Sequence, residues 1–359
     1  MKGSVTSLAI LILLSAAARL LVAGIDFPQL RHVKAQASPA TQAEAAKELI
    51  GRLIGTKASL FNVNVNESIG PEDRDTFELS SANDGNIQII GTSGVAVAMG
   101  FYHYLKYFCN GQRTWAGQQT QLPELLPAIA VTIKITTNDK FRYYQNVVTQ
   151  SYTMAFWNWE RWEQEIDWMA LHGINLPLAF VGQEAIFQKV YLTLGISQAE
   201  LDEYFSGPAF LAWARMGNIE GWGGPLPQAW ITNKLLLQQK ILSRMRSLGM
   251  MPVLPAFAGH VPKAITRVFP QANVTHLPTW NTFNATYSGT YLLDFQDPLF
   301  IGIGQLFMEM MIQELGTDNV YNCDIFNEMN PNSNDPSYLS AAGKAVFGGM
   351  LAGDPQAVC

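Results

Sequence analysis

From Tyr143 onward the sequence alternates between short apolar runs and helical segments, and this alternation limits the fold more than any other feature. The run Ile174–Phe180 is almost continuously apolar, which is typical of a parallel strand that is buried on both faces. Strand-like and helix-like segments alternate four times, without any repetition of sequence. The expected strands are residues 143–148, 174–180, 251–255 and 320–326, and the expected helices are residues 159–172, 183–194, 233–248 and 299–315. Such repeats predict a parallel α/β architecture.

Two parallel folds fit this alternation. A doubly wound sheet normally carries a glycine-rich phosphate-binding turn after its first strand, whereas residues 149–152 here are Thr, Gln, Ser and Tyr. A (β/α)8 TIM barrel needs no such turn, because its chemistry lies in the loops that follow the strands. A whole barrel takes about 250 residues, and residues 139–359 provide only about four of its eight units. The sequence therefore predicts an incomplete (β/α)8 TIM barrel over residues 139–359.

The preceding part of the chain has the pattern of a small α+β domain. Apolar residues recur at helical spacing from Ala43 to Leu53, and Gly55 is placed to end that helix. A second apolar helix is expected over residues 95–108. Strands are expected over residues 59–65, 76–80, 87–90 and 130–136. We therefore predict a first domain over residues 24–138.

The first 23 residues have the pattern of a secretory signal peptide. Lys2 precedes an apolar run, Val5–Leu14, which is followed by four small residues. This run is shorter than the roughly 20 residues of a membrane span, although a signal anchor remains an alternative. Three glycosylation sequons also suit an exported protein; they begin at Asn66, Asn273 and Asn284. We expect these asparagines to be glycosylated and the chain to contact no membrane after signal cleavage.

Composition excludes several classes of function. The chain has 23 basic and 29 acidic residues, a net charge of −6, and so lacks the positive charge that nucleic-acid binding requires. Its 3 cysteines show no CxxC spacing, so neither a disulfide scaffold nor a zinc site is predicted. We expect no nucleic-acid partner, no metal and no cofactor.

Polar and aromatic residues follow the expected barrel strands, where a barrel holds its active site. Amides, hydroxyls, an imidazole, indoles and a carboxylate form a set suited to binding sugars, whereas a phosphate site would contain lysine, arginine and glycine. Trp213 and Trp222, in loops rich in glycine and proline, are candidates for stacking on a sugar ring. The candidates at the strand ends are Asn146, Tyr152, His260, Asn327 and Glu328.

Glu328 is the candidate general acid. If the last strand is regular, alternation places Asp324 and Glu328 on the same side of it, facing the barrel axis. The alternative is structural, with Glu328 capping the next helix or pairing with an arginine. His260 has two interpretations as well, either as a substrate contact or as a packing residue before Pro262.

Five segments carry a resemblance to a known family. They are YYQNVVTQSY at residues 143–152, WEQEIDWMA at 162–170, GPAFLAW at 207–213, PVLPAFAGHVP at 252–262 and FNEM at 326–329. Together they resemble the alpha-N-acetylglucosaminidase family, lysosomal glycoside hydrolases that degrade heparan sulfate. The resemblance extends from about residue 26 to about residue 358 and departs at Val148, where the vertebrate enzymes are expected to have a cysteine.

The resemblance implies roles for the candidate residues. Glu328 would be the general acid/base of a retaining mechanism, with Asn327 beside it. Asn146, Tyr152 and Trp213 would line the pocket for the terminal sugar. The implied substrate is heparan sulfate or another terminal alpha-N-acetylglucosaminide, and the implied location is the lysosome, reached through the secretory pathway. A homo-oligomer of the full-length form is left open.

The resemblance also implies parts that this sequence is expected to lack: the C-terminal half of the barrel, a C-terminal helical domain and the catalytic nucleophile. A retaining glycosidase needs a second carboxylate about 5 to 5.5 Å from the acid, and related barrels supply it from a late strand. The 2-acetamido group of an alpha-linked sugar lies on the face of the leaving group, so it cannot replace that carboxylate. A truncated, inactive enzyme is therefore expected, with a non-catalytic carbohydrate-binding fragment or isoform as the alternative. An unrelated endo-acting glycosidase is a third hypothesis.

Overall fold

The computed structural model describes residues 27–359, so the expected signal peptide over residues 1–23 lies outside the described residues. The described residues divide into two units, residues 27–34 and residues 35–359, and each is considered by itself. The described part of the first unit contains a short 3-10 helix, η1 (Pro28–Leu30). The second unit contains residues 35–138 of the expected first domain and all of the expected barrel domain, and the expected boundary between residues 138 and 139 stays a prediction.

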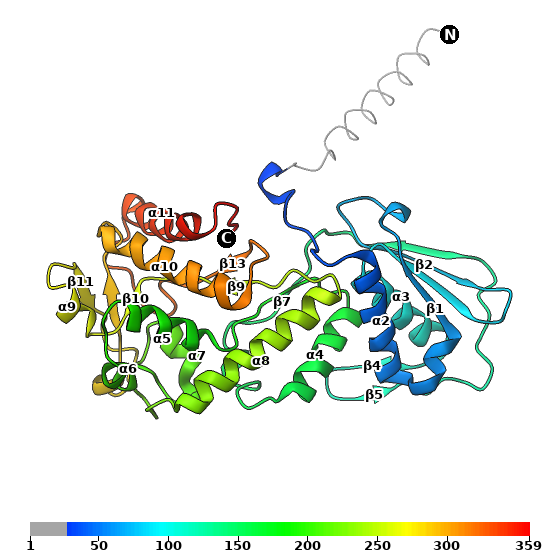
Figure 1. Cartoon of the computed structure of the whole chain (residues 1–359), viewed down its shortest axis with the longest axis horizontal. Coiled ribbons are helices and arrows are strands. Elements are labelled where there is room, and N and C mark those ends of the chain that lie inside the picture. The colour runs from blue at the N-terminus through cyan, green and yellow to red at the C-terminus, as the bar shows by residue number, and fades with distance from the viewer. Residues whose placement is uncertain (1–26) are drawn as a thin grey trace, which may run out of the picture. The chain divides into compact units, whose positions relative to one another are not determined.

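The N-terminal part of the second unit is a mixed sheet packed against two helices (Figure 1). Its sheet has the order β1-β3-β2-β6, in which β1 and β3 are parallel and the other neighbours are antiparallel. The elements are α2 (Pro39–Ile54), η2 (Gly55–Leu60), β1 (Phe61–Val65), η3 (Glu67–Ile69), β2 (Thr76–Ser81), β3 (Ile87–Gly91), α3 (Gly94–Phe108), β4 (Gln112–Arg113), β5 (Gln118–Gln119) and β6 (Ile133–Thr136).

Local sequence explains why these elements begin and end where they do. The side chain of Ser38 accepts a hydrogen bond from the backbone of Thr41 and so caps α2. Gly55 ends α2 with a φ of +62°, as predicted. The ring of Phe61 on β1 packs edge-on against Phe101 and Tyr104 of α3, with centroids 5.2 and 5.7 Å apart. These buried rings join helix and sheet into one core.

The rest of the chain contains short parallel strands separated by long helices. The strands are β7 (Tyr143–Tyr144), β8 (Leu176–Pro177), β9 (Leu254–Pro255) and β13 (Tyr321–Asn322). The long helices are α4 (Trp159–Leu171), α5 (Gln183–Thr193), α8 (Gln228–Ser247), α10 (Pro298–Leu315) and α11 (Pro336–Gly353). The predicted alternation of strands and helices is therefore present, but all four predicted strands, over residues 143–148, 174–180, 251–255 and 320–326, are too long.

The parallel strands are neighbours in the order in which they occur along the chain. β7 pairs with β8, and β9 pairs with β13, both in parallel. A parallel bridge between Leu178 and Val253 joins these two pairs, and a second one between Val320 and Val358 extends the order beyond β13. Sequential parallel order of this kind is that of a β/α barrel. It also brings the carboxyl ends of all these strands to one edge.

The long helices lie beside one another outside the strands, in the order α4, α8, α10 and α11 (Figure 1). A separate antiparallel sheet, ordered β10-β12-β11, is inserted between β9 and α10. The remaining elements are η4 (Thr149–Ser151), α6 (Gln198–Tyr204), η5 (Pro208–Phe210), α7 (Leu211–Arg215), β10 (His260–Val261), α9 (Ile265–Val268), β11 (Val274–His276), η6 (Ala285–Tyr287) and β12 (Tyr291–Leu293). Ser197 and Glu200 form a capping box at the start of α6.

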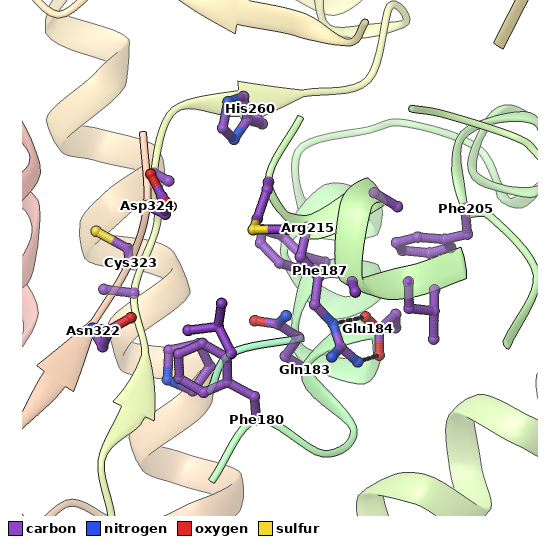
Figure 2. A pocket seen from close by; sticks show the side chains of 18 of the residues that line it. Phe180, Gln183, Glu184, Phe187, Phe205, Arg215, His260, Asn322, Cys323 and Asp324 are labelled. Carbon is purple, nitrogen blue, oxygen red and sulfur yellow. Dashed lines mark hydrogen bonds and ion pairs between the residues drawn. The ribbon is translucent and has the colours of Figure 1, made fainter. Parts of the chain in front are cut away.

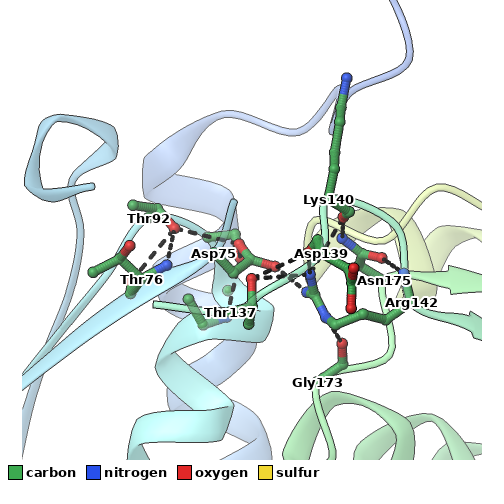
Figure 3. Close-up of polar contacts among 12 residues, drawn as sticks. Asp75, Thr76, Thr92, Thr137, Asp139, Lys140, Arg142, Gly173 and Asn175 are labelled. Carbon is green, nitrogen blue, oxygen red and sulfur yellow. Dashed lines mark hydrogen bonds and ion pairs between the residues drawn. The ribbon is translucent and has the colours of Figure 1, made fainter. Parts of the chain in front are cut away.

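A polar network joins the N-terminal sheet to the first barrel strand (Figure 3). The guanidinium of Arg142 pairs with the carboxylate of Asp75 and donates to the carbonyl of Gly173. Asp75 also accepts a 2.6 Å hydrogen bond from the hydroxyl of Ser93. Asn175 accepts from the backbone of Arg142 at 2.9 Å and donates to the carbonyl of Lys140 at 2.8 Å. The network therefore holds together the two ends of the connection between the domains.

Replacing Arg142 with alanine is expected to destabilise this junction strongly. The side chains of Arg142 and Asp75 are only 16% and 12% exposed, so Arg142→Ala leaves a mostly buried carboxylate without its partner. Such a change costs about 3–5 kcal/mol in free energy of unfolding. The matched control is Arg74→Ala, because the pair Arg74–Asp73 is 42% and 64% exposed, and it should cost less than about 1 kcal/mol. Urea unfolding measures both, and equal losses would contradict the prediction.

Helices α10 and α11 approach each other at a pair of glycines. A Cβ atom added at Gly304 would lie 3.0 Å from the Cα of Gly349, and one added at Gly349 would lie 3.2 Å from the Cα of Gly304, so a side chain at either position would crowd the facing helix. Gly302, two residues earlier in α10, has no atom within 4 Å of an added Cβ. The two glycines of α10 therefore differ in packing although they share one helix.

We expect Gly304→Ala and Gly302→Ala to change stability in opposite directions. Alanine at position 302 gains helix propensity worth up to about 1 kcal/mol without meeting a neighbour. Alanine at position 304 pushes α10 away from α11, and overpacking of this kind costs about 1–3 kcal/mol. Thermal unfolding of the two variants checks the difference, and a rise in Tm for both would show that the helices separate without cost.

Candidate active site

The chain turns sharply after β13, and this turn carries the candidate acid. The side chain of Asp324 accepts a hydrogen bond from the backbone of Phe326 at 3.3 Å, which ends the strand. Glu328 then adopts a left-handed backbone with a φ of +53°. The prediction that Asp324 and Glu328 lie on one side of a regular strand is therefore wrong, because strand alternation ends before Asp324.

Glu328 is exposed, and its carboxylate lies at a group of aromatic rings that are exposed or half-buried. The indole Nε1 of Trp280 donates to Oε2 of Glu328 at 2.9 Å. The ring of Trp213 lies 5.9 Å from that of Trp280, and the ring of Tyr152 stands edge-on to Trp213 at 4.4 Å. We call these three rings, Tyr152, Trp213 and Trp280, the aromatic group. The three rings and Glu328 come from separate segments: Tyr152 follows η4, Trp213 lies in α7, Trp280 lies between β11 and β12, and Glu328 follows β13.

The two candidate asparagines occupy different surroundings. Asn327 precedes Glu328, and its carbonyl oxygen accepts a 2.8 Å hydrogen bond from the side chain of the buried Asn218. Asn146 is exposed after β7, where its side-chain oxygen accepts a hydrogen bond from the backbone of Val148 at 3.0 Å.

A cavity of about 60 Å³ lies at the carboxyl ends of β8, β9 and β13 (Figure 2). His260 and Asp324 both line it, and the imidazole of His260 is only 5% exposed. Burial lowers the pKa of His260 to about 4, and the carbonyl of Ile325 opposes this effect. Burial also raises the pKa of Asp324, against its hydrogen bonds to the backbone of Phe326 and Asn327. The structure thus places His260 in an inner wall, apart from the aromatic group.

An ion pair forms another wall of the cavity (Figure 2). Arg215 binds both carboxylate oxygens of Glu184, at 2.6 and 2.9 Å, and donates to the hydroxyl of Ser151 at 2.9 Å. Both charged side chains are almost buried. Two parallel hydrogen bonds fix the relative orientation of the groups, so this pair is a rigid part of the wall.

A loop after α7 connects the cavity to the aromatic group. Gly217 lies against the ring of His260, since an added Cβ would be 2.4 Å from the imidazole. The next residues pair with the loop that carries Trp280, through the bridge between Ile219 and Ser288. Burial raises the pKa of Glu220, in this same loop, to about 7, and the charge of Lys263 opposes the rise.

The three sequon asparagines, Asn66, Asn273 and Asn284, are all exposed, as glycosylation requires. Asn66 and Asn284 each accept a local hydrogen bond through the side-chain oxygen, which leaves the nitrogen outward. Within residues 27–359, no helix is both long enough and apolar enough to cross a membrane. The same residues contain no cluster of three or more His, Cys, Asp and Glu that could hold a metal ion.

Sequence reasoning missed Trp280, which belongs to the group at Glu328. It lies between β11 and β12, outside the strand ends that the barrel pattern selects. Its position shortly before a sequon, in a loop rich in Thr and Asn, gives a weak signal of exposure. Trp222, by contrast, is surrounded by the rings of Phe210, Phe283 and Tyr287 and does not join the aromatic group.

Comparison with protein families supports both parts of the fold. The model of the alpha-N-acetylglucosaminidase (NAGLU) TIM-barrel domain matches residues 142–359. The model of the N-terminal domain of the same family matches residues 44–128. The predicted fold class, a small N-terminal α+β domain followed by part of a (β/α)8 barrel, is confirmed.

Individual relatives agree with the family models. The human alpha-N-acetylglucosaminidase is 51% identical over 321 residues, which are 89% of this chain and 43% of the human protein. A family 89 glycoside hydrolase from Clostridium perfringens, solved with 2-acetamido-1,2-dideoxynojirmycin, superimposes with a TM-score of 0.83 at 30% identity. The superposition covers 89% of this chain and 36% of the bacterial chain. A form of that enzyme with two glutamates replaced by glutamine, in complex with its substrate GlcNAc-alpha-1,4-galactose, gives a TM-score of 0.81 with the same identity and coverage.

This chain thus spans less than half the length of these relatives. The family model nevertheless covers most of the chain, and it includes every strand and helix that carries the candidate site. The resemblance found in the sequence is confirmed, and the chain belongs to the alpha-N-acetylglucosaminidase family.

Proposed function

We propose that this chain contributes the acid/base and sugar-stacking side of a site that removes terminal, alpha-linked N-acetylglucosamine from a glycan. The observation that carries the proposal is the 2.9 Å hydrogen bond between Trp280 and Glu328 at the aromatic group. An exposed carboxylate beside flat rings suits a sugar, because the rings cover its apolar face while the carboxyl reaches its glycosidic oxygen.

Glu328 is the proposed general acid/base of a retaining mechanism. As an acid it protonates the oxygen of the leaving group, and as a base it then removes a proton from the attacking water. The indole of Trp280 fixes the orientation of the carboxyl through Oε2 and leaves Oε1 for the substrate. Tyr152 and Trp213 are the proposed stacking residues, and Asn146 and Asn327 are proposed to bind sugar hydroxyls. A contact of His260 with the sugar stays a prediction, since the imidazole lies in the inner cavity wall.

The proposed substrate is heparan sulfate or another glycan that ends in alpha-linked N-acetylglucosamine. Two observations support this class: the identity of 51% to the human alpha-N-acetylglucosaminidase, and the similarity to a bacterial enzyme solved with GlcNAc-alpha-1,4-galactose. The proposed location is the lysosome, reached through the secretory pathway. The exposed sequons at Asn66, Asn273 and Asn284 are proposed to be glycosylated on that route.

A retaining mechanism also needs a nucleophilic carboxylate about 5–5.5 Å from Glu328. The expectation that this chain lacks that group stays a prediction, and so does the alternative that the chain binds carbohydrate without cleaving it. Turnover by the purified chain on a chromogenic alpha-N-acetylglucosaminide would show that the nucleophile is present. Saturable binding of N-acetylglucosamine without turnover would favour the binding function.

Glu328→Gln is expected to lower turnover on this substrate by about 100-fold or more, because glutamine cannot transfer a proton. Binding of N-acetylglucosamine, measured by calorimetry, should change little, because the amide oxygen still accepts the bond from Trp280. Glu309→Gln, which alters an exposed carboxylate on α10, is the control and should retain turnover. Where the wild-type chain binds the sugar without turnover, Trp280→Ala should abolish binding. Unchanged turnover and binding in both site variants would contradict the proposed site.

The half-buried Glu220 makes a contribution to stability that is largest at acidic pH. Burial raises its pKa from 4.5 to about 7, so the folded state holds a proton that the unfolded state releases. Its contribution to stability is therefore complete below about pH 4.5 and is lost as the pH rises through about 7. Glu220→Gln should reduce the fall in Tm between pH 5 and about pH 8. Glu124→Gln, at an exposed position, is the control, and an identical fall in Tm for all three proteins would refute the role of Glu220.

A further inference from the structure

Asn218 connects three segments that build the candidate site. Its side chain is 0% exposed, so it cannot touch a substrate. Its backbone nitrogen donates to the carbonyl of Trp213 at 3.0 Å, and its backbone oxygen accepts from Gly289 at 2.7 Å. Its side-chain nitrogen donates to the carbonyl of Asn327 at 2.8 Å, and its side-chain oxygen faces the amide nitrogen of Asn327 at 3.4 Å. Every polar group of this residue is therefore used to link α7, the loop of Trp280 and the turn of Glu328.

The turn at Glu328 needs such support. A left-handed backbone is unfavourable for a residue with a side chain, and it persists only where the surroundings hold it. The side chain of Asp324 binds the turn at the backbone of Phe326. Asn218 binds it at a second point, the peptide group that directly precedes Glu328. The half-buried side chain of Asp324 and the buried side chain of Asn218 thus hold the backbone of the turn by hydrogen bonds at Phe326 and Asn327.

The same residue also fixes the partner of Glu328. Gly289 follows Ser288, whose hydroxyl accepts a 2.5 Å hydrogen bond from the backbone of Trp280. Asn218 is therefore linked to the carboxylate of Glu328 through Asn327. It is linked to the indole of Trp280 through Gly289 and Ser288. A displacement at position 218 changes both ends of the Trp280–Glu328 hydrogen bond at once.

We propose that Asn218 is a positioning residue that holds Glu328 and Trp280 in the relative positions that the reaction needs. The expected loss of kcat rests on the proposed function, whereas the positioning of Glu328 and Trp280 by Asn218 rests on the contacts alone. Asn218→Ala removes both side-chain bonds to Asn327. Asn218→Asp keeps the volume and one oxygen but replaces the donor with an oxygen that repels the carbonyl of Asn327.

The matched control is Asn175→Ala. Asn175 is also buried and also makes two side-chain hydrogen bonds, but both go to backbone groups of the junction network, away from the turn. Loss of Asn175 should lower stability as loss of Asn218 does. A purely structural role for Asn218 would therefore make the two alanine variants alike in every measurement.

The readout is the indole N–H resonance of Trp280 in protein labelled with the heavy nitrogen isotope at tryptophan. Trp280→Phe assigns this resonance by its disappearance. We expect Asn218→Ala and Asn218→Asp to shift or broaden it, whereas Asn175→Ala leaves it in place. On a chromogenic alpha-N-acetylglucosaminide, the Asn218 variants should lose about 100-fold in kcat, since misplacement by about 1 Å costs that much, with KM nearly unchanged.

The outcomes separate this inference from the proposed function. Circular dichroism shows whether each Asn218 variant is folded. An unshifted indole resonance in a folded variant overturns the inference. If Asn218→Ala does not fold, the resonance of Asn218→Asp decides. An equal shift in Asn175→Ala also overturns the inference. If the wild-type chain neither binds N-acetylglucosamine nor turns over substrate, the proposed function fails while the resonance still reports whether Asn218 holds the turn.

Discussion

Parallel pairing of strands that follow one another in the chain is the constraint on which this structure depends. A parallel neighbour can be reached only by a crossover, so every pair of strands forces a helix between them. The paired segments are short, only two residues in β7, β8, β9 and β13, yet their common direction brings all the carboxyl ends to one edge. Asn146, His260 and Glu328 are thereby placed on the same side of the barrel although they are far apart in sequence.

The helices could be predicted from sequence because their determinants are local. Apolar spacing, the Ser197–Glu200 capping box and the glycine after α2 all lie within a few residues of the ends that they define. Strand ends could not be predicted in the same way. The sequence pattern of a strand continues to Phe326, but the side chain of Asp324 accepts a hydrogen bond from the backbone N–H of Phe326, and the chain turns there. This local hydrogen bond therefore decides where the strand ends, although the sequence pattern would allow a longer strand.

The candidate site was predictable in its residue types and strand positions but not in its assembly. Glu328, Tyr152 and Trp213 were expected from the barrel pattern and from the family resemblance, and the structure brings them to one place through Trp280. Trp280 and Asn218 meet the turn only through tertiary contacts, with Asn218 separated from Asn327 by 109 positions. No spacing rule links such distant residues, so only the folded chain reveals them.

The small antiparallel sheet between β9 and α10 has a consequence for how such a site changes over time. Trp280 lies in the loop joining β11 to β12, and that hairpin shares no ladder with the parallel strands. Insertions, deletions or exchange of the loop would leave the pairing of the barrel intact while replacing the ring beside Glu328. The scaffold and the surface that meets the sugar are thus separate modules, and glycan preference can diverge among relatives without rebuilding the barrel.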